Sequence, residues 1–177
     1  MSYYTGVGSR ETPPDIMRAM YHFAKNMTNR GQILRTGGAQ GADNAFAEGA
    51  LKSVNQLVEI YLPWQGFNGR CSPFHQVNED ALMIAKKVHP AWHRLSPAAK
   101  KLHGRNVYQV LGYGLDKPSS LLVCWTKNGE LVGGTRTAIV LAHMYNIPVF
   151  NLGKVTIADT IKFVKTHILE ELGEHDE

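Results

Sequence analysis

Three short glycine-rich segments, at residues 6–10, 37–41 and 133–137, have the composition of phosphate-binding turns. Glycine lets a backbone approach an anion closely, and the first turn of a following helix directs unpaired N–H groups and a positive dipole end at a phosphate. One such cluster could equally be a tight turn, but three together favour a ligand site. Its candidate residues are Gly8, Ser9, Gly37, Gly38, Gly41, Gly133, Gly134, Thr135 and Thr137.

Four further side chains have the chemistry to complete such a site. Arg10 and Arg105 carry guanidinium groups, whose fork of donors suits a phosphate or a carboxylate, although either could instead be a solvated surface arginine. Asp43 follows the second glycine cluster closely, so we expect it to accept a ribose hydroxyl or to cap its helix. Trp64, in a loop with Phe67, either stacks on a base or fixes that loop to the core.

Several other kinds of site are disfavoured by the same residues. The glycine clusters match neither the GxGxxG dinucleotide fingerprint nor the GxxxxGK[ST] phosphate loop, which argues against an ordinary NAD enzyme or NTPase. His89 and His93 have the i, i+4 spacing of a metal pair, but Pro90 interrupts a helix between them and no third ligand stands out. No nucleophile motif is present. We therefore expect neither a metal nor a cofactor.

Apolar runs alternate with helix-like stretches along the chain, and these elements must position the candidate residues. Strands are expected at residues 3–7, 32–36, 57–62, 120–126 and 147–150. Helices are expected after Pro13, at residues 42–53, 74–88 and 97–113, from the end of the 133–137 segment to about residue 145, and at residues 157–172. This alternation predicts an α/β fold, a Rossmann-like parallel sheet flanked by helices, with a helical and loop insertion at about residues 63–115. Ligands of such sheets gather at the carboxyl ends of the strands, where the glycine clusters fall.

Composition limits the class of protein. At 177 residues, 44% hydrophobic and 19% charged, the chain suits one globular domain over residues 1–177. No long apolar run suggests a membrane span, and the first residues lack the basic and apolar segments of a signal peptide, so we expect a cytoplasmic protein. Two cysteines make no disulfide framework. The net charge of +4 is mild, and the acidic residues gather near the C-terminus.

The motifs resemble those of the SLOG superfamily, which includes the core of DNA-processing protein A, the Lonely Guy cytokinin-activating phosphoribohydrolases and a YspA-like branch. The matching segments cover most of the chain: Gly8-Ser9-Arg10, residues 37–43, His103-Gly104-Arg105-Asn106 and residues 133–137. The GSR, GGAxGAD and RN elements look closest to the YspA-like branch. The resemblance implies a nucleotide-derived ligand, adds Asn106 to the candidate site, and implies a homodimer or larger homo-oligomer.

One departure from the Lonely Guy pattern bears on catalysis. The glutamate of the PGGxGTxxE motif, which assists cleavage of the base–ribose bond in those enzymes, corresponds to Val140 or Ile139 here, and neither can act as an acid or base. Any hydrolysis would need another carboxylate, with Arg105 beside it as a catalytic candidate. The available carboxylates are Asp43, Glu48, Glu79 and Asp80.

We therefore expect a protein that binds a nucleotide, nucleotide sugar or ADP-ribose-like ligand, as a sensor or by sequestering it. Two alternatives stay open: an N-glycosidic nucleotide hydrolase, and a protein that binds single-stranded DNA in recombination. The second alternative draws on a basic segment at residues 81–115, which has no Asp or Glu and contains Lys86, Lys87, Arg94, Lys100, Lys101 and Arg105.

Overall fold

Five parallel strands form one sheet: β1 (Tyr3–Gly8), β2 (Ile33–Gly37), β3 (Val58–Tyr61), β4 (Leu121–Trp125) and β5 (Val149–Asn151). In the computed structural model, which describes residues 2–156, 158–159 and 162, their order is β3-β2-β1-β4-β5. β1 is thus central, and β2 and β4 pair with it on either side. The predicted Rossmann-like α/β fold is confirmed.

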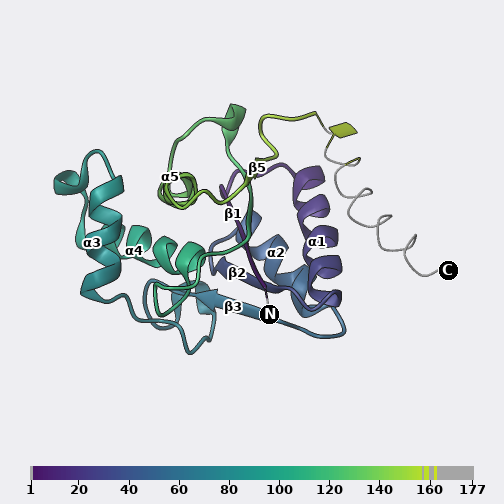
Figure 1. Ribbon diagram of the computed structural model, residues 1–177, viewed down its shortest axis with the longest axis horizontal. Coiled ribbons are helices and arrows are strands. Elements are labelled where there is room, and N and C mark those ends of the chain that lie inside the picture. Colours follow the sequence, from purple (N-terminus) through teal and green to yellow (C-terminus); the bar gives the residue numbers. More distant parts are fainter. Residues whose placement is uncertain (1, 157, 160–161, 163–177) are drawn as a thin grey trace.

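Helices cover both faces of the sheet (Figure 1). On one face lie α1 (Pro14–Asn29) and α2 (Ala42–Leu51), and on the other lie α4 (Pro97–Leu111) and α5 (Thr135–Met144), with α3 (Glu79–Val88) outside α4. Side chains alternate along a strand, so each strand contributes to both cores. Val123 of β4 packs with α1 and α2, whereas its neighbours Leu122 and Cys124 pack with α4 and α5.

Most elements begin and end within two residues of the expected positions. The helix expected over residues 74–88 was wrong at its start: α3 begins only at Glu79, because Asn78 caps it by accepting a hydrogen bond from the Ala81 N–H at 2.9 Å. The helix expected over residues 157–172 falls almost wholly outside the described residues. None of the described helices is long and apolar enough to cross a membrane.

The long connection between β3 and β4 contains two short 3-10 turns, η1 (Phe67–Gly69) and η2 (Trp92–Arg94), besides α3 and α4. α4 packs directly against β1, β2 and β3, so it is the crossover helix between β3 and β4. α3 packs mainly against α4 and α5. The connection therefore supplies both a regular crossover helix and an outer layer that covers it.

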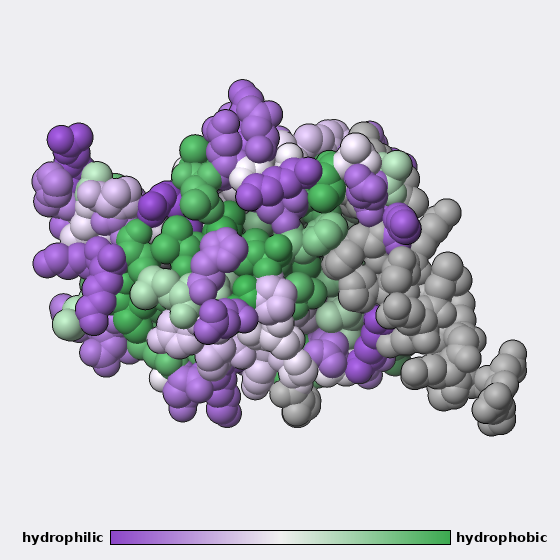
Figure 2. Space-filling view, turned by 45° about the horizontal axis from the view of Figure 1, so that its top comes forward, coloured by the Kyte–Doolittle hydropathy of each residue, from purple (hydrophilic) through white to green (hydrophobic). Residues whose placement is uncertain are grey.

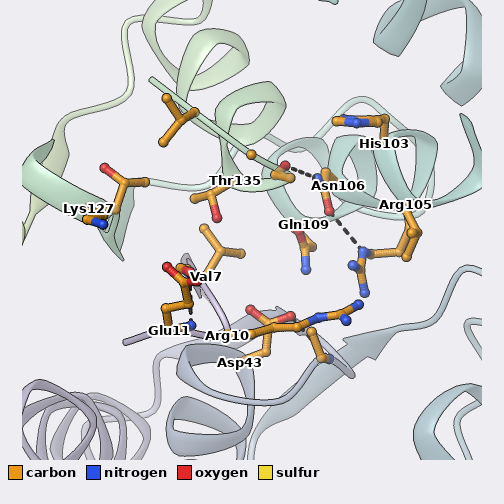
Figure 3. A pocket seen from close by; sticks show the side chains of 18 of the residues that line it. Val7, Arg10, Glu11, Asp43, His103, Arg105, Asn106, Gln109, Lys127 and Thr135 are labelled. Carbon is orange, nitrogen blue, oxygen red and sulfur yellow. Dashed lines mark hydrogen bonds between the residues drawn. The ribbon is translucent and has the colours of Figure 1, made fainter. Parts of the chain in front are cut away.

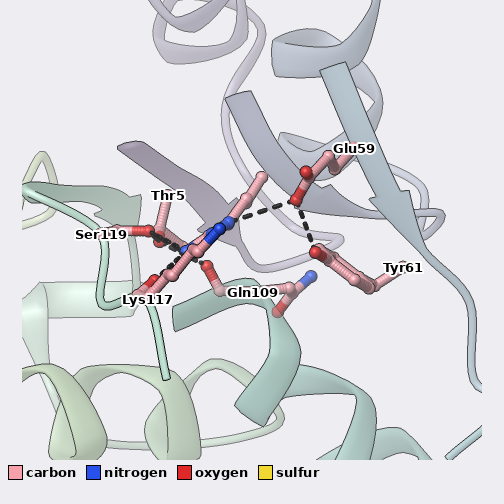
Figure 4. Close-up of polar contacts among 7 residues, drawn as sticks. Thr5, Glu59, Tyr61, Gln109, Lys117 and Ser119 are labelled. Carbon is pink, nitrogen blue, oxygen red and sulfur yellow. Dashed lines mark hydrogen bonds and ion pairs between the residues drawn. The ribbon is translucent and has the colours of Figure 1, made fainter. Parts of the chain in front are cut away.

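A buried arginine of β2 holds the loop between α4 and β4 against the sheet. Arg35 of β2 is 2% exposed, and its Nε lies 3.2 Å from Oε2 of Glu59 on β3. Its Nη1 donates to the Lys117 carbonyl at 2.5 Å, and its guanidinium lies over the Tyr3 ring at 3.7 Å. Figure 4 shows how Glu59, Lys117 and the neighbouring Ser119 gather around this point. The loop after α4 is thereby held against β2 and β3.

Candidate functional site

A cavity of about 580 Å³ opens where β1 and β4 end. These neighbouring strands lie where the strand order reverses, which is the usual ligand position in open α/β sheets. Figure 2, with the upper end of Figure 1 turned forward, shows apolar surface in the centre of the face and hydrophilic surface around it. The walls come from the β1–α1 turn, the start of α2, one face of α4 and the β4–α5 connection, which includes the turn η3 (Lys127–Gly129).

One face of α4 forms a wall of the cavity. Its lining residues recur at helical spacing: Ala99, Leu102, His103, Arg105, Asn106 and Gln109. The helix is held at its start by Ser96, which accepts a hydrogen bond from the Ala99 N–H at 3.2 Å. The spacing predicts a common face, but only the packing of α4 on β1 and β2 turns that face toward the strand ends.

Arg105 and Asn106 are predicted site residues, and both line the cavity, yet much of their bonding capacity is used within the protein. Arg105 is 5% exposed; its Nε donates to Asn106 Oδ1 at 2.9 Å and its Nη1 to the Tyr61 carbonyl at 3.2 Å. Asn106 in turn donates through Nδ2 to the Gly134 carbonyl at 2.6 Å. Asn106 therefore positions Arg105 and the start of α5 relative to one another.

Asp43 lies on the opposite wall, in the first turn of α2, and is almost fully buried. Its Oδ2 accepts a hydrogen bond from the Ala39 N–H at 3.3 Å. Burial raises the pKa of Asp43 to about 6, while the positive charge of Arg105 and the N–H groups of Ala39 and Gly8 act in the opposite direction. The Asp43 carboxylate therefore contacts the backbone of the turns that precede α2. No side chain caps the start of α2 at Gly41.

Gly37, at the end of β2, marks the point where three polar side chains converge. A Cβ added there would collide with Nη1 of Arg105, Oδ2 of Asp43 and Nε2 of Gln109. A carboxylate accepts hydrogen bonds, a guanidinium donates them and an amide does both. Figure 3 shows the side chains of Asp43, Arg105 and Gln109 directed into the cavity from three directions. We call this group the cavity floor.

The third glycine cluster is the most accessible of the predicted turns. Gly133 and Gly134 are exposed cavity-lining residues at the start of α5, and a Cβ added at either would meet no atom within 4 Å. Thr135 follows them, and its side chain also faces the cavity (Figure 3). The first N–H groups of a helix have no partner within the helix, so this turn offers donors to an anion.

The glycines of the first two clusters lie in close contact with other parts of the chain. A Cβ at Gly8 would lie 2.6 Å from the Ala42 Cβ, and one at Gly38 would lie 2.5 Å from the Leu62 side chain. At Gly41, where φ is +80°, a Cβ would lie 2.6 Å from the Ser9 carbonyl oxygen. The β1–α1 and β2–α2 turns therefore touch each other. Gly8, with Ser9 and Arg10, lines the cavity, whereas Gly37, Gly38 and Gly41 are not among its lining residues.

Two other predicted residues lie outside the cavity lining. Trp64 is half-exposed after β3 and packs edge-on against Phe67, with ring centroids 5.2 Å apart. Thr137 is fully buried, and its Oγ1 lies 2.7 Å from Nδ1 of His103. Burial, together with smaller effects of His89, Arg105 and Arg136, lowers the pKa of His103 to about 4, so this ring is neutral at pH 7.

Several lining residues were missed from the sequence: Glu11, His103, Gln109, Lys127 and Val132. His103 and Gln109 share the α4 face of Asn106, three positions away on either side, so helical spacing was a usable signal for both. Glu11 and Lys127 follow β1 and β4, and their approach depends on strand order. Within the described part of the chain, no three His, Cys, Asp or Glu side chains are grouped closely enough to hold a metal ion.

Comparisons with known proteins locate the fold. No protein-family profile and no curated protein matches the chain. Among solved structures, DNA processing protein A from Helicobacter pylori, described for its single-stranded DNA binding mode, aligns with a TM-score of 0.57 and 15% identity. The alignment covers 96% of this chain and 81% of that one. The predicted relation to DNA-processing protein A is confirmed at the level of fold, while the YspA-like and Lonely Guy relations stay predictions. The chain has the α/β fold of DNA processing protein A over nearly its whole length.

Proposed function

We propose that the protein binds a nucleotide-derived ligand in the cavity at the ends of β1 and β4, with the ligand's phosphate at the first turn of α5. The observation that carries the proposal is the open backbone at Gly133 and Gly134 facing the same cavity as Arg10 and Arg105. A volume of about 580 Å³ lies within the range of pockets that bind small molecules, roughly 300–1,000 Å³.

The charges around the cavity support an anionic ligand. Arg10 extends across the cavity toward Arg105 in Figure 3, and its positive charge contributes to lowering the pKa of Arg105, after the larger effect of burial. An anion near both arginines would relieve their mutual repulsion. Lys127 adds an exposed positive charge at the mouth. The carboxylate of Asp43 makes the floor less favourable for phosphate than the start of α5.

Binding without hydrolysis is the function that these residues support best. α5 has no acidic residue, and the glutamate of the Lonely Guy pattern corresponds to Val140 or Ile139 here. The carboxylates that line the cavity are Glu11, which is exposed, and Asp43, which is engaged by backbone N–H groups.

The test replaces Gly134 with valine. Its φ of −65° and ψ of −30° suit any residue, and its surroundings are open, so Gly134→Val should fold while its side chain blocks an anion from the turn. We expect at least one of a panel of nucleoside monophosphates, nucleotide sugars and ADP-ribose to raise the thermal midpoint of the parent but not of Gly134→Val. Ala98→Val, at an exposed first-turn position of α4, is the matched control and should keep the shift. Undiminished binding by folded Gly134→Val would contradict the proposed phosphate position.

Single-stranded DNA is the second candidate ligand. It is supported by the fold shared with DNA processing protein A and by exposed cations on α3, η2 and α4, namely Lys86, Lys87, Arg94 and Lys101. The same purified proteins should be titrated with oligodeoxythymidylates of increasing length at two salt concentrations. Affinity that grows with length and falls steeply with salt would favour DNA, because backbone contacts release counterions. A mononucleotide that binds as tightly as any oligomer would favour the cavity.

A further inference from the structure

Gln109 is a buried residue of α4 whose side-chain amide faces the cavity. The residue is 1% exposed, and its backbone carbonyl accepts a hydrogen bond from Thr5 Oγ1 at 2.6 Å. Its side-chain amide makes no hydrogen bond to any residue that the structure describes, yet it points into the cavity (Figure 3). Buried amides are rarely left unpaired in proteins, so a group of this kind facing a cavity indicates a position for a ligand.

Asp43 defines what that ligand group must be. Its carboxylate faces Gln109 across the space that Gly37 leaves open, and one of its oxygens already accepts the Ala39 N–H. An ionised carboxylate can accept about four hydrogen bonds and donate none. A group on the floor must therefore donate to Asp43, and it can donate to or accept from Gln109. A hydroxyl does both.

The other parts of a nucleotide fit the floor poorly. A phosphate on the floor would lie against the Asp43 carboxylate as well as the Arg105 guanidinium, and repulsion by the carboxylate offsets attraction by the guanidinium. The first turn of α5 offers N–H donors without an opposing carboxylate. A base needs an apolar face, and the apolar lining comes mainly from Ala99, Leu102 and Val132, at the start of α4 and before α5. The sugar is the part that remains for the floor when the phosphate occupies the first turn of α5.

We propose that Asp43 and Gln109 form a subsite for the ribose hydroxyls of the ligand, and that the protein thereby selects ribonucleotides over 2′-deoxyribonucleotides. This inference rests on the proposed function, because it assumes a phosphate at α5. A deoxyribose leaves a buried acceptor or donor of the floor unpaired, and sites built to bind a hydroxyl reject analogues that lack it.

The experiment measures affinities of AMP, GMP, CMP and UMP, each against its 2′-deoxy counterpart, by isothermal titration calorimetry. For the base that binds best, the parent should prefer the ribonucleotide by about tenfold or more. In Gln109→Met, which keeps the side-chain length, the preference should fall to about threefold or less, because one hydroxyl partner is lost. The affinity for inorganic phosphate itself, obtained by competition and corrected for the nucleotide's own affinity, should be the same in parent and variant. Gln76→Met, an exposed glutamine outside the cavity, should retain the full preference.

Each outcome separates the two proposals. Equal affinity of the parent for ribonucleotides and deoxyribonucleotides would overturn the sugar subsite and leave the proposed function standing. A parent that binds none of the eight nucleotides, nor any other member of the panel above, would overturn both. A full ribose preference in folded Gln109→Met would remove Gln109 from the subsite. If Gln109→Met does not fold, the ratio measured on the parent still decides the sugar preference, and Asp43→Asn, which keeps the shape of the side chain, should reduce it.

Discussion

Asp43, which we place in the proposed sugar subsite, also carries a cost in stability because it is buried. Its carboxyl lies at the start of α2, beside Arg105 and within reach of two backbone N–H groups, and burial still raises its pKa to about 6. A carboxyl whose pKa is higher in the folded than in the unfolded protein binds protons more tightly when folded. Its ionisation therefore lowers the free energy of unfolding as the pH rises from the ordinary carboxyl pKa of 3.8 through about 6.

This gives a prediction for Asp43→Asn, which resembles the protonated carboxyl at every pH. Relative to the parent, the variant should gain about 1 kcal/mol of unfolding free energy between pH 5 and pH 7.5, because only the parent must ionise a buried group over that interval. Urea denaturation at both pH values measures the difference. Asp116→Asn, at an exposed position, is the control and should show no such change. A constant difference between Asp43→Asn and the parent would mean that Asp43 is ionised as easily as in the unfolded chain.

At the scale of elements, α1 and α2 pack closely against each other on one face of the sheet, next to the β1–α1 and β2–α2 turns. Gly49 of α2 makes this approach possible, because a Cβ added there would collide with the carbonyl oxygen of Tyr21 on α1. Gly104 of α4 is also buried within a helix, but its added Cβ would meet only side chains, those of Val77 and Leu82. Side chains can move aside, whereas the backbone of a packed helix cannot do so cheaply.

The two glycines should therefore respond differently to alanine. Alanine in place of glycine favours a helix by up to about 1 kcal/mol, and overpacking costs about 1–3 kcal/mol. We expect Gly49→Ala to lower the free energy of unfolding by about 1–2 kcal/mol, and Gly104→Ala to change it by less than about 1 kcal/mol. Denaturant titrations of both variants test this. Equal changes in the free energy of unfolding would show that α1 and α2 can move apart as easily as the side chains around Gly104 can move aside.

At the scale of the whole molecule, the network around Arg35 joins segments that are far apart in the sequence. The guanidinium connects β2 to Glu59 on β3 and to the loop that leads from α4 into β4, and the Tyr61 hydroxyl donates to the same glutamate at 2.5 Å. The next residues of the network, Thr5 and Ser119, are joined by a 2.9 Å hydrogen bond. The crossover helix that carries Arg105 and Gln109 is thus held at its C-terminal end.

Removing this guanidinium should destabilise the whole fold. We expect Arg35→Met to lower the free energy of unfolding by about 2–4 kcal/mol, since Glu59 and the Lys117 carbonyl lose a charged donor. Adding Glu59→Gln should recover part of this loss, because the unpaired charge is then removed as well. Arg18→Met, on the exposed side of α1, should change stability by no more than about 0.5 kcal/mol. Failure of the double variant to recover any stability would mean that packing of the arginine, and not its charge, holds the loop.

Local sequence alone determined the strands, most helix positions and the location of the glycine turns at strand ends, because apolar periodicity and turn residues act over a few neighbours. It also identified Arg105, Asp43, Gly133 and Gly134 as candidates that the structure brings to one cavity. The absence of a glutamate after the last glycine turn was likewise visible in the sequence.

Only the tertiary structure decided which turns are open and which side chains are free. Gly41 and Gly133 look alike in sequence, but Gly41 packs against the β1–α1 turn while Gly133 faces empty space. Asn106 and Gln109 are both amides on one helix face. The Asn106 side chain is hydrogen-bonded to Arg105 and Gly134, whereas the Gln109 side-chain amide has no partner among the described residues. The physical reason is that access and hydrogen-bond satisfaction depend on neighbours that strand order brings together, and these neighbours come from distant parts of the chain.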